Sequence, residues 1–342
     1  MVYRWERLKD LAKANARIGH ISISRWSEFM RLLRDSVQSK AGWQWVFRGQ
    51  RDATWNLASS LEREMRPLLG RKSKILQGRD VSSLREFVLN GERRLVEEFQ
   101  QLARVGAFAQ SAFSSSAIES PVDGLAILQH YGAKTRLLDF TYSLSVAAAF
   151  AYEERWTNEP RSIWAINLDL LIARIPKMLE GLISCQTMLD KVKGPSRQPL
   201  THWPTDSSHV FAPYFRAFAN KQIEDPQTEQ CGVIPICLTG NNPRLVAQNG
   251  MFLFPLAFDT FENNLVNVLG CSPSSFKQLT ELGKKTETVL QESIFRDHTL
   301  LKIDLAPQME DEAWDVLDQL HVNPHQLFPD LDGLAKSMRI RF

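Results

Sequence analysis

The sequence predicts an α+β fold, because candidate strands are scattered among helices without the regular alternation of a doubly wound sheet. Apolar residues alternate with period two in several short segments and recur at helical spacing in others. The chain has 342 residues, of which 44% are hydrophobic, so it can bury a sizeable core. The formal net charge of +2 gives no overall polyanion-binding signature. Many arginines between residues 24 and 112 leave room for a local basic patch.

The N-terminal third is predicted to be mostly helical. Residues 4–35 have a helical pattern that places Trp26, Phe29, Met30 and Leu33 on one face, and we treat 1–40 as a helical segment preceding a domain over 41–342. Alternating aromatic residues predict a strand at 43–48. A short helix follows from near Leu61, and a long helix covers 81–105, with a break expected at its glycine at position 91.

The rest of the chain alternates between short strands and helices. A helix over 122–131 ends at Gly132, and a strand is expected within 135–140. Ser143 is a candidate N-cap for a helix whose alanine stripe would let it pack close to a sheet. The polar segment 185–230 is interpreted as an insertion or lid. Further strands are expected at 162–168, 232–238, 251–256 and 299–305, and a helix at 311–320.

Cysteine usage and the N-terminus indicate a cytoplasmic protein. The four cysteines show no C-x2-C spacing, so no zinc site is expected. Asp330-Leu-Asp332 could suggest metal binding but is interpreted as a turn and helix cap, so no other metal is expected either. The N-terminus lacks an apolar signal-peptide core, and no run of 18 apolar residues occurs. We therefore expect a soluble protein with no membrane partner.

The stretch from Trp43 to Arg51 is the first candidate for a functional site. Its alternation would deliver Arg48 to the end of a strand, where Gly49 would let the backbone turn. An arginine at such a place can clamp a phosphate or carboxylate with two hydrogen bonds. The alternative is an arginine that only pairs with a structural carboxylate.

The second candidate runs from Gln129 to Ser143. His130 could bind a ligand or transfer protons, although a core histidine is the commoner case. Arg136 and Asp139 are interpreted as a structural ion pair. Thr141 and Ser143 would either cap the following helix or bind a ligand at its N-terminus.

The third candidate is Gln248, in an amide-rich turn before a strand. Its side chain could read a ribose or a base edge, or it could bond the backbone of its own turn. Familiar catalytic patterns are absent: the chain has no G-x-G-x-x-G, no G-x4-G-K-[ST], no H-E-x-x-H and no G-x-S-x-G.

These segments together resemble the FRG domain family, over roughly residues 40–335. The resemblance rests on Phe47-Arg48-Gly49, Gln129-His130-Tyr131-Gly132, Thr135 to Thr141, Ala147 to Ala151, Ala247 to Phe252 and Leu327 to Gly333. The order of the segments is also similar, more distantly, to ADP-ribosyltransferases of the Arg-Ser-Glu type. That similarity implies split mixed β-sheets with surrounding helices.

The more distant similarity implies roles for individual residues. Arg48 would hold NAD, used as a substrate, while Thr141 and Ser143 would line the nicotinamide pocket and Gln248 would take the glutamate position. Phe47, Gly49, His130, Tyr131, Arg136 and Phe140 would complete the cofactor site. Two departures stand out: Thr141-Tyr142-Ser143 is not Ser-Thr-Ser, and Gln248 carries no negative charge to stabilise an oxocarbenium-like centre.

The resemblance therefore implies an NAD-dependent ADP-ribosyltransferase toxin, in a toxin–antitoxin or phage-defence setting. An antitoxin protein would restrain it. The acceptor would be RNA or DNA, towards which the arginine-rich N-terminal third points, or alternatively a protein. Two other hypotheses stay open at this point. One is a nucleotide-binding or sensing module without turnover, and the other is an interaction protein in which the motifs only shape the fold.

Overall fold

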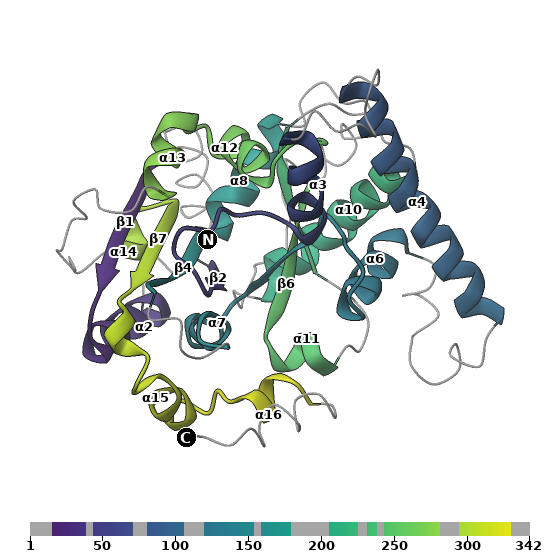
Figure 1. Cartoon of the computed structure of the whole chain (residues 1–342). Helices are drawn as coiled ribbons and strands as arrows, with labels where there is room; N and C mark the ends of the chain where they lie inside the picture. Colours follow the sequence, from purple (N-terminus) through teal and green to yellow (C-terminus); the bar gives the residue numbers. More distant parts are fainter. Residues whose placement is uncertain are drawn as a thin grey trace.

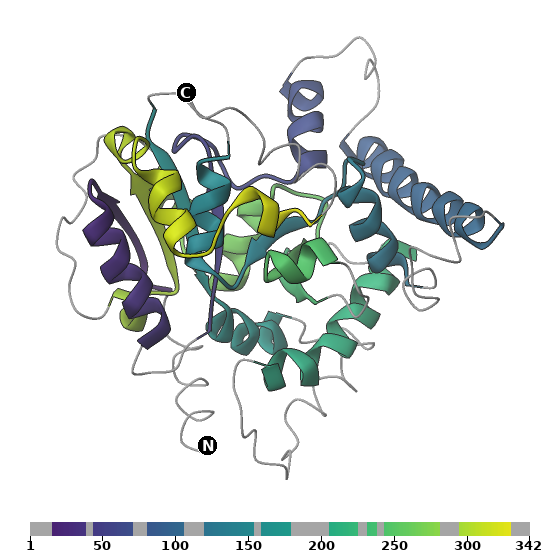
Figure 2. The same cartoon turned by 90° about the horizontal axis from the view of Figure 1, so that it is seen from below.

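A computed structural model describes residues 16–38, 44–70, 81–105, 120–153, 159–178, 205–224, 231–237, 243–280 and 294–329. These residues form one seven-stranded mixed sheet in the order β1-β7-β4-β2-β3-β6-β5, with helices around it (Figures 1 and 2). The predicted α+β class is confirmed.

The strands are short and largely buried. Their bounds are β1 Ile18–Ile23, β2 Trp45–Gln50, β3 Leu138–Thr141, β4 Arg161–Asn167, β5 Val233–Ile236, β6 Gly250–Pro255 and β7 Leu300–Leu305. The helices are α2 Trp26–Gln38, α3 Ser60–Gly70, α4 Val81–Val105, α6 Pro121–His130, α7 Leu144–Ala151, α8 Leu168–Met178, α10 Thr205–Glu224, α11 Pro243–Ala247, α12 Phe261–Leu269, α13 Pro273–Thr280, α14 Ile294–Asp297, α15 Ala313–Gln319 and α16 Pro324–Leu327, with a 3₁₀ turn at Pro307–Met309.

The backbone pairing of the sheet is shortest in the middle, between β2 and β3. Strands β1 and β7 pair in parallel and the other neighbours are antiparallel. Strand β2 shares six registered pairs with β4, but it meets β3 at one pair only, Phe47 with Thr141. The ladder does not continue to Arg48, so the two halves of the sheet are joined at one point with space beside it.

Two apolar clusters hold the sheet. The first packs the sheet against α6, α8, α10, α12 and α13. The second packs strands β1, β2, β4 and β7 against α2, α7, α14 and α15. The first cluster contains residues of β2, β4 and β7 together with residues of β3, β5 and β6, so the halves of the sheet are fixed to each other by packing as well as by the β2–β3 pair.

Helix α7 approaches β2 unusually closely, as its alanine stripe predicted. A Cβ atom on Gly49 would lie 1.9 Å from the main-chain oxygen of Ala147, so no side chain fits there. The predicted turn at Gly49 was wrong: this glycine lies inside β2, and close backbone approach explains it. Ser143 caps α7 as predicted, since its side chain accepts from the Val146 amide.

The N-terminal prediction was wrong in part. Residues 18–23 form strand β1 instead of helix, because they find a parallel partner in β7, which lies near the other end of the chain. Helix α2 begins at Trp26, and Met30 on it is 41% exposed, so it does not share the buried face of Phe29. Residues 4–15 and Trp43 lie outside the described residues.

Two further expectations need correction. Helix α10 occupies much of the segment interpreted as an insertion, and Phe215, Phe218 and Ile223 on it join the core. The remainder of that segment, 185–204 and 225–230, lies outside the described residues. Helix α4 runs through Gly91 without a break, since the position is open and a helical glycine there costs only about 1 kcal/mol. Asp330 and Asp332, interpreted from the sequence as part of a turn and helix cap, also lie outside the described residues.

Candidate functional site

A cavity of about 660 Å³ opens where the sheet narrows between β2 and β3. Its walls come from β2, β3, β6, the end of α6, helix α11, and the segment that leads from β2 into α3. Four arginines and two carboxylates line it: Arg48, Arg51, Arg63, Arg244, Asp139 and Glu153. The excess of guanidinium groups makes the cavity a candidate site for an anion.

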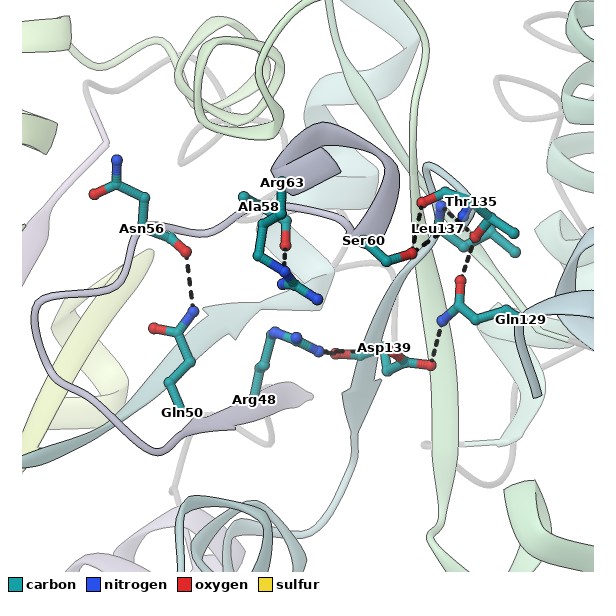
Figure 3. A network of polar contacts seen from close by, with 10 residues as sticks. All are labelled: Arg48, Gln50, Asn56, Ala58, Ser60, Arg63, Gln129, Thr135, Leu137 and Asp139. Carbon is teal, nitrogen blue, oxygen red and sulfur yellow. Dashed lines mark hydrogen bonds and ion pairs between the residues drawn. The ribbon is translucent and has the colours of Figure 1, made fainter. Parts of the chain in front are cut away.

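Arg48 reaches across the gap between the two halves of the sheet. Its Nη1 donates to the main-chain oxygen of Asp139 at 2.9 Å and lies 3.7 Å from Oδ2 of the same residue (Figure 3). Burial lowers the pKa of Arg48, the Asp139 charge raises it, and the charge of Arg63 lowers it further. A guanidinium nevertheless stays protonated in proteins, so Arg48 keeps a fixed positive charge in the cavity.

Arg63 supplies a second guanidinium from helix α3. Its Nη1 donates to the main-chain oxygen of Ala58 at 2.8 Å, which fixes the side chain on the same side as Arg48 (Figure 3). Both arginines donate to neutral main-chain oxygens, which orient the guanidinium groups, and the Asp139 carboxylate 3.7 Å from Arg48 offsets part of the charge of that residue. Two oriented like charges beside each other favour an anion between them.

Asp139 faces Arg48 and is held by the second motif. Gln129 donates from Nε2 to Oδ1 of Asp139 at 2.8 Å, and its own Oε1 accepts from the hydroxyl of Thr135 (Figure 3). Ser60 completes the network by bonding the main chain of Thr135. The surrounding protein raises the pKa of the Asp139 carboxyl, and Arg48 opposes that rise. The carboxylate is still 59% exposed to the cavity, so the pair with Arg48 is a loose one.

Arg136 does not pair with Asp139 as predicted. It forms an ion pair with Glu92 of α4 at 2.6 Å, and its guanidinium stacks on Phe254 at 4.3 Å. The side chain is buried away from the cavity. Its predicted structural role was right, its predicted partner was wrong, and the structure does not bring it to the proposed cofactor site.

Thr141 lines the cavity, whereas Ser143 is not among its lining residues. The Thr141 hydroxyl donates to the main-chain oxygen of Gln248 at 2.7 Å and accepts from the Ser143 amide. The Ser143 hydroxyl accepts from the Val146 amide and contacts Ser145. Of the two interpretations left open for Ser143, the helix cap is the one that the geometry shows.

Gln248 lies at the cavity wall, but its amide is engaged elsewhere. Its Nε2 donates to the main-chain oxygen of Leu327 at 3.1 Å, which ties α11 to α16. This bond reaches 79 residues along the chain, so it is not the local turn bond that the sequence suggested. The neighbouring Arg244, which also lines the cavity, stacks on Phe328 at 4.3 Å, so the last described segment packs against this cavity residue.

The other predicted cofactor residues divide into two groups. Phe47, Gly49, His130 and Phe140 line the cavity. Tyr131 is 72% exposed outside it, with its ring against the edge of His130. The structure therefore gathers most of the predicted residues in one place and leaves Tyr131, Arg136 and Ser143 out.

Sequence reasoning assigned no role to Arg51, Arg63, Trp55 or Arg244. The abundance of arginine between 24 and 112 was a signal for the first two, but helical arginines usually face solvent. Only the folding of α3 over β2 turns Arg63 into a cavity residue.

The Arg48, Gln129 and Asp139 cluster lies wholly within residues 43–159, and this range matches the FRG domain family. The match covers about a third of the chain. The match ends at Glu159, so the cavity residues Arg244, Gln248 and those of β6 lie beyond it. No curated protein and no solved structure matches the chain.

Two features are absent from the described residues, a metal site and a membrane-spanning helix. No group of three or more His, Cys, Asp or Glu side chains converges as a metal site in the part of the chain that the structure describes. Among the described helices, none is long and apolar enough to cross a membrane.

Proposed function

We propose that the FRG domain of this chain binds NAD in the arginine-lined cavity and transfers its ADP-ribose to an acceptor. The observation that carries the proposal is the placement of Arg48 and Arg63, anchored by main-chain oxygens, in a cavity at the junction of β2 and β3. A diphosphate is the ligand group whose charge and hydrogen-bond acceptors best match two oriented guanidinium groups.

The size and walls of the cavity support a nucleotide. Its volume of about 660 Å³ falls among cofactor sites, which range over about 300–1,000 Å³. Phe47, Phe140, Phe150 and Phe252 supply apolar wall, and the arginines supply the polar contacts. A dinucleotide needs both kinds of surface, since its rings are apolar and its diphosphate is charged.

The reaction would break the bond between C1′ of the ribose and the nicotinamide nitrogen, which keeps the electron pair. The acceptor nucleophile would then bond to C1′ and lose its proton. Holding the diphosphate fixes the ribose relative to the acceptor, and this positioning lowers the barrier. Thr141 would form part of the ribose wall, while Gln248, engaged with Leu327, is not required to carry charge.

The biological setting follows from the resemblance to transferase toxins. A toxin of this kind needs a restraining antitoxin protein, and its acceptor would be RNA, DNA or a protein. The four cavity arginines support a nucleic acid acceptor, because a phosphate backbone would be attracted to the same charge.

A second candidate is a nucleotide-binding or sensing module without turnover. The engagement of Ser143 as a helix cap and of Gln248 with Leu327 supports it, since neither side chain is then directed at a ligand. Such a module would use the same arginines and differ only in leaving the glycosidic bond intact.

One assay separates the candidates. Purified protein is incubated with adenine-labelled NAD and, in separate reactions, with RNA, DNA or cell lysate, and both free nicotinamide and label on macromolecules are measured. The transferase predicts nicotinamide release with label transfer, and both signals should disappear in Arg48→Ala. Binding of NAD by calorimetry without nicotinamide release in any reaction would reject the transferase and leave the binding module.

A further inference from the structure

Trp55 is a large aromatic residue whose side chain stays accessible inside the arginine-lined cavity. The residue is 43% exposed and lines the cavity, whereas Ala53 and Leu57, two positions away on either side, are fully buried. A single exposed apolar residue on a mobile surface needs no explanation. Trp55 differs because its neighbours anchor its backbone, so that the ring is presented at a fixed place.

The turn that carries Trp55 is fastened on both sides. The Asp52 carboxylate accepts from the amide and the hydroxyl of Thr54 at 2.7 and 2.6 Å, which closes a turn of the kind aspartate favours. Bonds to distant elements then hold the segment: Ala53 N to Pro160 O at 2.8 Å, Gln50 Nε2 to Asn56 O at 3.1 Å, and Leu57 N to Glu262 Oε1 at 3.0 Å.

Arg51 further restricts the position of the Trp55 ring. Its guanidinium lies 5.6 Å from the centroid of the Trp55 ring, within the range of a cation–π contact. The pair therefore presents an aromatic surface and a positive charge together, in the same cavity as Arg48 and Arg63.

We propose that Trp55 is the platform on which the base of a nucleoside diphosphate stacks, while Arg48 and Arg63 hold the diphosphate. This inference rests on the anion site of the proposed function, but it requires no transfer reaction. Stacking on an aromatic side chain tolerates any base, because every base has a π face. A nucleoside diphosphate is the ligand that uses an aromatic ring and paired guanidinium groups at once.

The test compares two ligands that differ only in the nucleoside. Titration calorimetry measures the affinities of ADP and of inorganic pyrophosphate for the wild type, Trp55→Ala and Trp55→Phe. Trp55→Ala should weaken ADP binding about tenfold and change pyrophosphate binding less than twofold, as loss of a base–aromatic stack would. Trp55→Phe should retain most of the ADP affinity. The control is Phe87→Ala, which removes a 67% exposed ring on α4 outside the cavity and should change neither affinity.

Three outcomes would overturn the inference: ADP binding unchanged in Trp55→Ala, equal losses for both ligands, or a wild type that binds ADP no more tightly than pyrophosphate. Failure of the transferase proposal looks different. In that case ADP binding depends on Trp55 as expected, yet NAD releases no nicotinamide.

Discussion

Replacing Asp139 by Asn should strengthen anion binding in the cavity. The exchange keeps the shape of the side chain and an oxygen that can accept from Gln129, and it leaves the main-chain oxygen that holds Arg48. What it removes is one negative charge 3.7 Å from the Arg48 guanidinium, a charge that competes with any bound anion.

The separation of the two groups sets the size of the effect. At 3.7 Å a pair of unit charges is worth about 4 kcal/mol at an effective dielectric constant of about 20, and about 1 kcal/mol in bulk water. Because 59% of the Asp139 side chain is exposed, the lower figure applies. Asp139→Asn should therefore bind pyrophosphate roughly fivefold more tightly, by about 1 kcal/mol.

Calorimetry with pyrophosphate at two salt concentrations measures this change. The control is Glu97→Gln, which removes the same charge from an exposed pair with Arg93 on α4 and should leave the affinity unchanged. Equal or weaker binding in Asp139→Asn would refute the reasoning. It would mean that the carboxylate positions Arg48 or touches the ligand itself.

The wild type should show the same increase in anion affinity when Asp139 is protonated. Protein atoms packed around the Asp139 carboxyl raise its pKa, even though 59% of the side chain is open to the cavity, so the carboxyl becomes neutral on acidification at a higher pH than an ordinary aspartate. The affinity for sulfate, which keeps its charge over this range, should increase as the pH falls through that raised pKa. His130 also lines the cavity, so the part of the increase that is missing in Asp139→Asn is the part due to Asp139.

The remaining predictions concern the clamp, the helix contact and the cap. Arg48→Ala should weaken pyrophosphate binding by about 2 kcal/mol, with Arg48→Lys intermediate because a point charge lacks the planar fork; equal affinity in all three proteins would contradict the clamp. Gly49→Ala should lower the free energy of unfolding by about 3 kcal/mol or prevent folding, since its Cβ would strike the Ala147 carbonyl. Denaturant unfolding checks this against Gly91→Ala, which meets nothing within 4 Å and should be neutral or stabilising by up to about 1 kcal/mol. Ser143→Ala should cost about 1 kcal/mol of stability and leave pyrophosphate affinity unchanged; a loss of affinity without a loss of stability would return Ser143 to the ligand site.

Local chemistry in the sequence was enough to predict much of this protein. Alternation of side chains placed β2 and put Arg48 near its end, and the alanine run after Ser143 predicted both a capped helix and its close packing. These features depend on neighbouring residues, whose spacing is written directly in the chain. The FRG segments within residues 43–159 were visible for the same reason, because each is a short continuous segment.

The contacts that make the cavity were decided by the tertiary structure. Asp139 could pair with Arg136 or with Arg48, and the fold chose Arg48, because α4 carries Glu92 to Arg136 and the narrowing of the sheet leaves Arg48 opposite Asp139. Strand β1 likewise exists only through β7, about 280 residues further along the chain. Short-range periodicity specifies which face of an element is apolar, but not which distant element covers it. Long-range pairing therefore determined where the charges meet.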